Sequence, residues 1–562
     1  MALKGKGAIK AMGKLMAGKP LDIGRASEIE VGKAHAKVNR STWGGSDGFE
    51  VIAKVEDAQH VWEALLGTGA TAVKGEAVEP ETEDILKAPA GMVEPRKPYF
   101  IGQASVYKAL KPGSDKRTWR WVDPGLEPRK TCLYEWHKEH TKTIVPFAGW
   151  LMPVWYSKIS EEHEACRRTA VLFDVSHMGT LDVRGEGAER FLDLITAPYV
   201  PRLHPGESSY GYLLGPDAGP IDDIWIYRRA KDNFLVVVNA SNAEKDIDWI
   251  NAVASKQVVI DSRRPWVEID CDAFEVRYLK DPKVGRDQRV DISFQGPKSL
   301  PTLLECVQDE ALAKKVKALK RAAFTQGAVA GVDAIISRTG YTGEAVGFEL
   351  YVHPADALQL WESLLRAGRP HGVIPAGLGA RDSTRTEAGY PLYGHELAGE
   401  RGIGPIEAGY PQFVRFHKPF FVGRTPLLEK DQRRTMRVAR FRMLKRGIPV
   451  VKPGSPVANR QGQIVGFVTS CASLPDGRQV GMAYLEDRYT DVGTRFGVLV
   501  PPRGKEPAPK EVAALKLGDK VPMAEEAVVL MRFRDPLKPD DAEVEEGKAA
   551  KSQADLTKGA AR

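Results

Sequence analysis

One sequence pattern occurs twice in this chain, and this repeat constrains the fold more than any other feature. Residues 48–66 align without gaps on residues 347–365, so that Trp62 stands opposite Trp361. The sequence KPYFIG at 97–102 then echoes KPFFVG further along the chain, in the same order. Chance explains one such match more easily than two. We therefore interpret the N-terminal region as a shortened copy of a later part of the chain.

The copy is incomplete, and this predicts its role. The Gly-Ala-Arg-Asp segment at 379–382 has no counterpart in it. We expect residues 21–127 to form an N-terminal extension, a degenerate partial repeat of residues 337–430, that is structural or an interaction module rather than a second active site. Residues 1–20 carry five lysines and no acid, and we expect them to be a basic flexible arm.

Strand and helix signals alternate along the middle of the chain. The run FLVVVNA at 234–240 is typical of a strand, and the polar segment after it is typical of a helix. From about Met436 the pattern changes to short apolar segments between turns rich in proline and glycine, which indicates a small β-barrel. The sequence thus predicts a multidomain α+β fold, with a C-terminal β-barrel over residues 435–535 and a disordered tail over residues 536–562.

Composition argues against several classes of protein. No uncharged apolar run approaches the roughly 20 residues that cross a bilayer, so we expect no membrane span. Much of the net charge of +7 comes from the N-terminal lysines, and no basic stripe with aromatic residues follows, which argues against nucleic-acid binding. The five cysteines are scattered and form no metal or disulfide pattern, so we expect a reducing, cytoplasmic location and no bound metal.

A series of long segments carries the strongest functional signal. They are PFAGWLMPVWY at 146–156, EEHEACRRTAVLFDVSHMGTLDVRG at 161–185, SYGYLLGPDAGPIDDIWIY at 209–227, SRTGYTGEAVGFEL at 337–350 and PAGLGARDSTRTEAGYPLYGHEL at 375–397. In order, spacing and residues, they resemble the aminomethyltransferase, or T-protein, of the glycine cleavage system. The resemblance covers about residues 130–500. It implies a folate-binding aminomethyltransferase-like fold for the catalytic region, residues 128–430, with an insertion at about 255–289.

The resemblance also implies a reaction. In that family an aminomethyl group is carried on a sulfur of the lipoyl arm of H-protein. Its methylene carbon passes to tetrahydrofolate, and ammonia is released. For this chain the resemblance therefore implies an enzyme with tetrahydrofolate as cofactor and lipoylated H-protein as partner, and the reaction needs no metal or redox group.

Two neighbouring carboxylates, Asp222 and Asp223, follow a turn and precede a predicted strand at 224–227. Neighbouring side chains of a strand point to opposite faces, so only one of the two can face a given site. The resemblance assigns the essential carboxylate to Asp222. A fixed carboxylate there can stabilise developing positive charge and accept a proton, so we expect Asp222 to be catalytic.

Glu349 is the second candidate carboxylate. Strand alternation places Glu349 with Tyr351 on one face and Phe348 with Leu350 on the other. The 2-amino group and the ring N–H of a pteridine are donors that one carboxylate can accept together. The resemblance implies that Glu349 holds this ring. The alternative is an exposed strand acid, as Glu50 in the N-terminal copy is expected to be.

The resemblance implies further cofactor-binding residues. Arg381 matches an arginine that contacts folate, and a guanidinium group can clamp a carboxylate or stack on a ring. The remaining expected contacts are Asn239, Tyr341, Met178 and Tyr210. His177 and His395 lack a nucleophile or a second metal ligand at a recognisable spacing, and we expect both to be structural.

Some segments depart from the family and leave the donor open. The turn before Asp222 reads Ala-Gly-Pro where the family has paired glycines, and no aromatic-rich C-terminal segment is recognisable. One alternative is a tetrahydrofolate-dependent demethylase or methyltransferase with another S-, O- or N-methyl donor. Another is a non-catalytic folate-binding accessory protein. The cysteine motif of such accessory proteins is replaced here by KPFFVGR at 418–424, which argues against this alternative.

Overall fold

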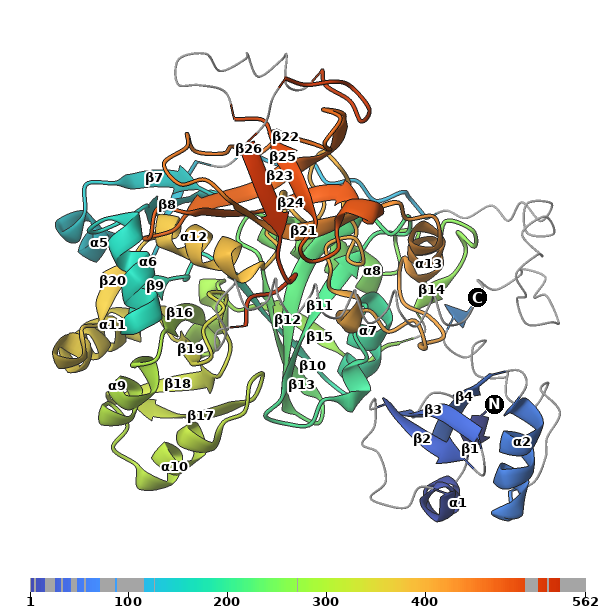
Figure 1. The fold of residues 1–562 in the computed structure, drawn as a ribbon. Coiled ribbons are helices and arrows are strands. Elements are labelled where there is room, and N and C mark those ends of the chain that lie inside the picture. Colours follow the sequence, from blue (N-terminus) through green and yellow to red (C-terminus); the bar gives the residue numbers. More distant parts are fainter. Residues whose placement is uncertain are drawn as a thin grey trace.

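Figure 1 shows the computed structural model of the chain, with a β-barrel above two β-sheets and a small N-terminal unit to one side. The structure describes residues 2–4, 7–15, 26–31, 34–41, 48–54, 57–70, 86–87, 116–125, 127–269, 271–500, 514–522 and 525–535. The expected second repeat match at 97–102 and the expected tail at 536–562 lie outside these residues.

The five-stranded sheet is antiparallel, with the order β11-β12-β13-β10-β15. Its strands are β10 (Gly179–Arg184), β11 (Ser208–Leu214), β12 (Pro220–Ala230), β13 (Asn233–Val238) and β15 (Glu275–Tyr278). Ile224 and Ile226 of β12 point to the outer face, where they pack with helices α7 (Ala188–Ile195) and α8 (Ala243–Ala254). Trp225 and Tyr227 alternate with them and point to the inner face.

The six-stranded sheet has the order β17-β18-β19-β16-β9-β20, and its edge strand β20 runs parallel to β9. Its strands are β9 (Val171–Asp174), β16 (Val290–Gln295), β17 (Phe324–Val329), β18 (Val332–Ser337), β19 (Gly347–Val352) and β20 (Ile374–Ala376). Helices α9 (Ser299–Glu305), α10 (Glu310–Ala318) and α11 (Ala357–Gly368) bury apolar residues against its outer face, including Leu303, Leu312 and Trp361.

The inner faces of the two sheets meet. Tyr227 and Val237 of the five-stranded sheet pack with Ile335 and Tyr351 of the six-stranded sheet. Residues 175–178 join β9 to β10, each of which is one strand in from the edge of its sheet, so the chain passes directly from one sheet to the other. We call this junction the seam. Side chains from distant parts of the sequence therefore share one space between two sheets.

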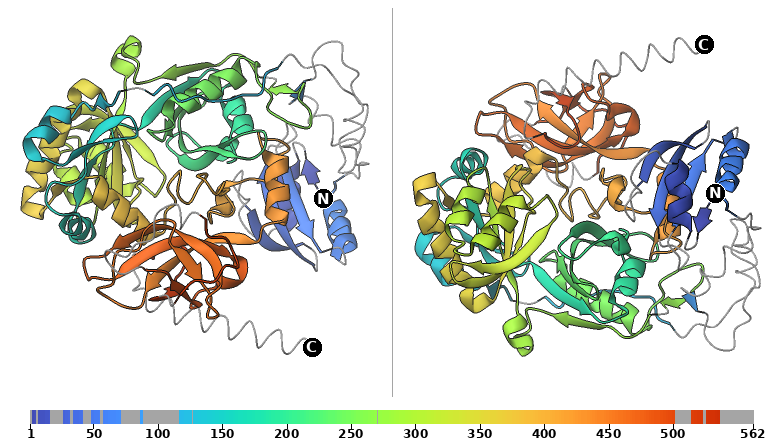
Figure 2. Two further views of the ribbon diagram at one scale, coloured as in Figure 1. Left: turned by 90° about the horizontal axis from the view of Figure 1, so that it is seen from above. Right: turned by 90° about the horizontal axis from the view of Figure 1, so that it is seen from below.

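The C-terminal domain is a closed barrel with the strand order β21-β24-β23-β22-β25-β26. Its strands are β21 (Met436–Met443), β22 (Pro456–Ala458), β23 (Ile464–Ser473), β24 (Gln479–Glu486), β25 (Arg495–Val498) and β26 (Glu525–Val529). Helix α12 (Leu378–Ala388) contacts β23 and β24 of the barrel and also α6 (Ile159–Arg168). Both views in Figure 2 show the barrel and the two sheets around a common centre.

The N-terminal unit is a four-stranded sheet with the order β1-β4-β3-β2 and two helices. Its elements are β1 (Ala2–Lys4), α1 (Ala8–Leu15), β2 (Ala26–Val31), β3 (Ala34–Ser41), β4 (Gly48–Ala53) and α2 (Ala58–Gly67). The expectation of a flexible arm over residues 1–20 is wrong for β1 and α1. Ala8 and Met12 share one face of α1 and are buried in the core of this unit.

Shorter elements join these parts. β6 (Arg129–Lys130), β7 (Ile144–Phe147) and β8 (Trp150–Pro153) form a small sheet, and β5 (Leu86–Lys87) pairs with β14 (Glu268–Ile269). Further helices are α5 (Tyr134–His140), α13 (Arg424–Gln432) and the 3-10 helices Val200–Arg202, Pro282–Asp287, Pro354–Asp356, Arg369–His371, Pro411–Phe413 and Asp487–Tyr489. The expected insertion at about 255–289 supplies β14 and the edge strand β15. No helix in the described part of the chain is long and apolar enough to span a membrane.

Candidate active site

Asp222 and Asp223 stand at the start of β12, where the register with β11 shifts. Alternation along β12 puts Asp223 on the inner face with Tyr227. Asp222 lies two residues before Ile224, so alternation places it on the outer face with Ile224. There it contacts Asn242, the residue that precedes α8. The two carboxyls are therefore directed to different faces of the sheet.

Asn239, directly after β13, ties the two carboxyls together. Its Nδ2 donates to Oδ1 of Asp222 and to Oδ1 of Asp223, both at 2.9 Å, and its backbone N–H donates to Oδ2 of Asp222 at 2.8 Å. Asn242, at the start of α8, donates to Oδ1 of Asp222 at 2.5 Å. Because Asp222 is fully buried, these amides take the place of water as its hydrogen-bond partners.

Asp223 has a strongly altered acidity. Burial, and next the charge of Asp222, raise the pKa of Asp223 to about 7, against the lowering effect of hydrogen bonds from Tyr210 and Asn239. Tyr210 Oη donates to Oδ2 of Asp223 at 2.8 Å. A carboxyl with a pKa near 7 changes its protonation state around neutral pH, which suits a group that accepts or gives a proton.

The geometry favours Asp223 over Asp222 for the catalytic role that the sequence assigned to Asp222. Asp222 is saturated by Asn239 and Asn242 and is directed away from the inner face. The signal for this distinction was present in the sequence. Ile224 and the apolar residues that share its parity mark the outer face of β12, and Asp222 shares that parity.

Glu349 lies on the inner face of β19, as strand alternation predicted, and is 8% exposed. Thr339 Oγ1 donates to its Oε2 at 2.5 Å. Burial raises the pKa of Glu349, while the hydrogen bond from Thr339 and the charge of Arg381 lower it. The hydroxyls of Tyr227 and Tyr351 share a hydrogen bond of 2.9 Å between the sheets. Polar groups thus connect β12 with β19.

Arg381 lies in the first turn of α12. Its Cζ is 5.2 Å from the ring centroid of Tyr341. Its charge lowers the pKa of Glu349 and of Asp291, an inner-face carboxyl on β16. Arg381 Nη1 is buried and has no hydrogen-bond partner among the described residues. Such a nitrogen is a donor that a ligand can satisfy.

The other predicted contacts lie around the same inner face. Tyr341 Oη donates to the carbonyl of Pro391 at 2.5 Å. Met178, at the seam, packs against the inner-face cluster and against Trp150. The ring of Tyr210 has four aromatic neighbours at centroid distances of 4.9 to 5.9 Å, which are Tyr212, Trp225, Tyr410 and Phe413. These contacts place Met178 and Tyr210 at the inner face and Tyr341 beside Arg381.

A segment that the sequence did not reveal extends this aromatic group. Residues 530–535 follow the last barrel strand, and the ring of Phe533 lies 4.7 Å from that of Tyr410 and 6.3 Å from that of Tyr390. Arg532 fixes the segment by donating to backbone carbonyls of the loop after α12. A single phenylalanine in a charged stretch gives no sequence signal for such a contact.

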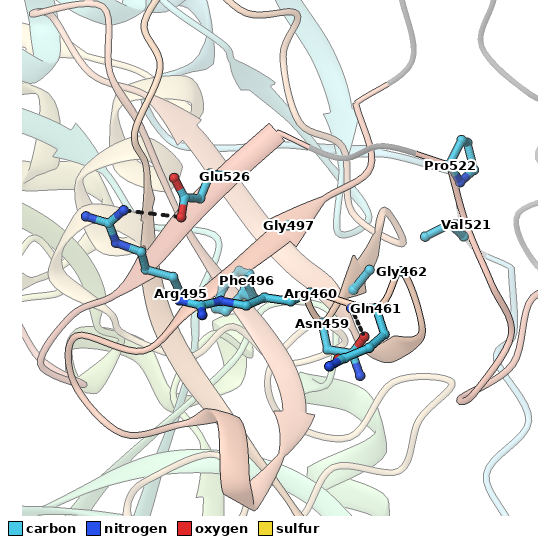
Figure 3. Close-up of a pocket in the computed structure, with 11 residues that line it drawn as sticks. Asn459, Arg460, Gln461, Gly462, Arg495, Phe496, Gly497, Val521, Pro522 and Glu526 are labelled. Carbon is cyan, nitrogen blue, oxygen red and sulfur yellow. Dashed lines mark hydrogen bonds and ion pairs between the residues drawn. The ribbon is translucent and has the colours of Figure 1, made fainter.

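The hollow drawn in Figure 3 lies elsewhere, on the barrel. It has a volume of about 400 Å³ and lies between the turn at 459–462 and β25, where Arg495 pairs with Glu526 at 3.3 Å. None of the residues that line it belongs to the inner face. We therefore do not connect this hollow with the chemistry of the two carboxyls.

Comparisons with known proteins decide the family. Residues 133–418, about half of the chain, match the family described as the GCVT N-terminal domain. This chain belongs to the GCVT family. Among its GCVT relatives, the aminomethyltransferase of Desulforamulus reducens is 38% identical over 376 residues, which cover 66% of this chain and 94% of that protein. The aminomethyltransferase of Bacillus subtilis is 37% identical over 370 residues, which cover 65% and 93%.

A solved GCVT structure has a similar fold. The glycine cleavage system aminomethyltransferase T from Bartonella henselae is 27% identical, with a TM-score of 0.58, and the match covers 73% of this chain and 98% of that one. The predicted α+β fold with a C-terminal barrel is thereby confirmed. This GCVT member is an enzyme, an aminomethyltransferase of glycine cleavage.

Proposed function

We propose that this aminomethyltransferase moves the methylene carbon of an aminomethyl group to tetrahydrofolate and releases ammonia. One observation carries the proposal. Asp223 and Glu349 lie on the inner faces of two sheets that are joined by the hydrogen bond of 2.9 Å between Tyr227 and Tyr351. Two buried carboxyls on the facing sides of two sheets suit a division of labour, in which one binds the acceptor and the other handles a proton.

The residues around Glu349 fit a reduced folate. Glu349 can accept hydrogen bonds from the 2-amino group and the ring N–H of the pteridine, because both are donors. Arg381 offers a buried nitrogen that lacks a partner among the described residues, and Tyr341 offers a flat ring beside it. Bound tetrahydrofolate supplies the nitrogens N5 and N10 that take up the one-carbon unit.

Asp223 is the proton-handling group in this proposal. As a carboxylate it stabilises positive charge that develops nearby, and with a pKa near 7 it can accept a proton and return it. Asn239 fixes the position of its oxygen. Asp222 accepts a hydrogen bond from Asn239 and so fixes its orientation, and the charge of Asp222 helps to keep the pKa of Asp223 high. Asp222 is thus a positioning residue.

We further propose lipoylated H-protein as the partner that carries the donor, and the cytoplasm as the location. The support is the resemblance of the site segments to the T-protein and the name of the Bartonella henselae enzyme, which places that enzyme in the glycine cleavage system. The match with the Desulforamulus reducens relative spans 94% of that protein, so this chain has counterparts for nearly all of it.

The test is a set of aspartate-to-asparagine variants assayed with tetrahydrofolate and aminomethylated H-protein. Asp223→Asn should reduce turnover by about 10²–10⁴-fold, the usual contribution of a general acid–base group, and should leave tetrahydrofolate affinity nearly unchanged. Asp222→Asn should have a smaller effect on turnover. Asp232→Asn, at an exposed turn at the far end of β12, serves as the matched control. Ammonia and methylenetetrahydrofolate are measured.

The pH profile gives a second readout of the same assignment. Because Asp223 accepts a proton only when ionised, turnover of the parental enzyme should rise as the pH increases through about 7. If Asp223→Asn kept the parental rate while Asp222→Asn abolished it, the catalytic role would belong to Asp222. If both variants kept the rate, the pair would have no catalytic role.

A further inference from the structure

Several buried polar groups at the seam between the two sheets are not used by the proposed mechanism. His177 lies between β9 and β10 and is 4% exposed. Lys280 follows β15, where the backbone N–H of Leu279 donates to the carbonyl of Thr180 in β10 at 2.8 Å. Asp291 lies near the start of β16, next to the residue that pairs with the last residue of β9.

Three buried side-chain nitrogens of this group lack hydrogen-bond partners among the described residues. They are Lys280 Nζ, His177 Nδ1 and Arg381 Nη1. The ammonium and guanidinium nitrogens are donors, and His177 Nδ1 is a donor in the tautomer that carries the proton there. Because most buried polar atoms in native proteins are hydrogen-bonded, such a group of nitrogens suits a polar ligand that accepts hydrogen bonds.

Packing places these residues near one another, because Met178, next to His177, and Leu378, one turn before Arg381, both pack against the cluster that contains Trp150. The positive charges of Arg381 and Lys280 lower the pKa of His177, after burial, which is the main cause of its fall to about 3. Lys280 Nζ lies 4.4 Å from the ring centroid of Trp150, and Arg129 Cζ lies at the same distance. Since Trp150 packs against Met178, the group adjoins the inner face described above.

No carboxylate near Lys280 is bonded to its ammonium group. The charged and titratable groups that act on Lys280 are Arg129, Asp174, Cys132 and Asp291. Asp174 accepts hydrogen bonds from His137 and from the backbone of Ser176, both at 2.8 Å. Burial and the charge of Glu349 raise the pKa of Asp291 well above its usual range, which disfavours its ionised form. Lys280 Nζ accordingly has no hydrogen-bonded carboxylate among the described residues.

We propose that Lys280, His177 and Arg381 form a subsite that binds the carboxylate group of a ligand. Both carboxylate oxygens can accept hydrogen bonds, so an ammonium group, a guanidinium group and an imidazole N–H in one neighbourhood suit this group. The inference rests on the proposed function for the origin of the carboxylate. It belongs either to the glutamate end of tetrahydrofolate or to a second, small ligand that is itself an amino acid or a related acid.

The subsite has a pH signature. Burial, and next the charge of Arg129, lower the pKa of Lys280 to about 7. A bound carboxylate favours the ammonium form and raises this pKa again. Above pH 7, binding of the carboxylate must therefore be accompanied by uptake of a proton by Lys280. The affinity of the ligand should accordingly fall as the pH rises. Calorimetry in buffers of different ionisation enthalpy measures this uptake.

The test compares the full-length protein with Lys280→Met, an apolar substitution of similar length. Lys283→Met, at an exposed position of the following 3-10 helix, is the matched control. Three probes are titrated: tetrahydrofolate, 6-methyltetrahydropterin, which lacks the glutamate, and N-methylglycine. We expect Lys280→Met to weaken the binding of one of the two carboxylate-containing probes about tenfold. The proton uptake that accompanies this binding above pH 7 should also disappear. The affinity of 6-methyltetrahydropterin should stay the same.

The probe whose binding is weakened in Lys280→Met identifies the ligand that supplies the carboxylate. Weaker binding of tetrahydrofolate alone assigns the subsite to its glutamate, and weaker binding of N-methylglycine assigns it to a small amino-acid ligand. The unfolding midpoint of ligand-free Lys280→Met should equal or exceed that of the parent, because an unpaired buried amine is removed.

Three results would overturn the subsite. The first is a lower midpoint with unchanged affinities, which would make Lys280 a structural residue. The second is an equal loss of affinity for 6-methyltetrahydropterin, which would mean that Lys280 contacts an oxygen of the pterin ring and not a carboxylate. The third is the absence of any Lys280-dependent binding among the probes. A parental protein that bound neither tetrahydrofolate nor the pterin would instead contradict the proposed function, whatever Lys280 does.

Discussion

The two copies of the repeated sequence have the same local structure. Strand β4 of the N-terminal unit and strand β19 of the six-stranded sheet begin at aligned glycines, and helices α2 and α11 begin at aligned alanines. The residues before these helices, Asp57 and Asp356, have φ and ψ of −93° and −6° and of −99° and −7°. Aligned sequence therefore gives aligned backbone.

The surroundings of the two copies differ. Trp361 of α11 is fully buried and has the ring of Trp136 at 5.3 Å, whereas the aligned Trp62 of α2 is 40% exposed. On the strands, Tyr351 is 1% exposed and faces the second sheet, whereas the aligned Ile52 is 63% exposed. A local pattern thus sets the shape of an element. The rest of the chain decides whether that element becomes part of a site.

The carboxylates of the two strands show the same contrast. Glu349 accepts a hydrogen bond from Thr339 on the face that looks towards Asp223 and its sheet. The aligned Glu50 accepts one from Asn39 at 3.2 Å, within its own small sheet. Glu50 is therefore expected to have no part in folate binding, although its sequence context matches that of Glu349.

The largest expected effect comes from truncating the aligned tryptophans. Trp361→Ala should destabilise the six-stranded sheet by about 3–5 kcal/mol, because it removes a fully buried side chain. Trp62→Ala should cost about 1 kcal/mol or less. Urea unfolding, monitored through the loss of tetrahydrofolate binding, measures the stability of the region around Trp361. Equal shifts of the unfolding midpoint for the two variants would mean that the different exposure of Trp361 and Trp62 does not affect their contributions to stability.

A smaller effect is expected from the aligned glutamates. Glu349→Gln should weaken tetrahydrofolate binding by about 1.5–3 kcal/mol, the range for hydrogen bonds to a charged group. Glu50→Gln is the matched control and should leave the affinity unchanged. Calorimetric titration measures both. An effect of Glu50→Gln as large as that of Glu349→Gln would show that the N-terminal copy also binds folate.

The smallest effect is expected two residues further along the same strands, at Tyr351 and the aligned Ile52. Tyr351→Phe removes the hydrogen bond to Tyr227 and should destabilise the protein by about 0.5–1.5 kcal/mol. Ile52→Thr, at the aligned exposed position, should change stability by no more than about 0.5 kcal/mol. Tyr227→Phe combined with Tyr351→Phe should cost less than the sum of the single changes. Strict additivity would argue against a bond between the sheets.

Features that depend on the local pattern could be predicted from the sequence. The alternation around Glu349 correctly placed it with Tyr351, and the short segments after Met436 predicted the barrel. The composition of residues 1–20 misled, because lysines dominate it. The buried pair Ala8 and Met12 of α1 is a weaker signal than five charges.

Features that depend on tertiary contacts could not be predicted. Asn239 bridges two carboxyls only because β12 and β13 are neighbours in register. The position of Lys280 beside Trp150 depends on the segment after α8, which returns to the edge of the five-stranded sheet as β15. Phe533 reaches Tyr410 only after the barrel has closed. In each case the sequence separation is too long for a pattern to report it.

The position of Phe533 bears on how the protein is made. The aromatic group around Tyr210 and Tyr410 receives this ring from a segment that leaves the ribosome after all six barrel strands. Domains generally fold in the order of their synthesis, so both sheets can form while this corner of the site is still open. A nascent chain halted within the barrel would therefore hold an unfinished catalytic centre, and mature activity would begin only with the last stage of translation.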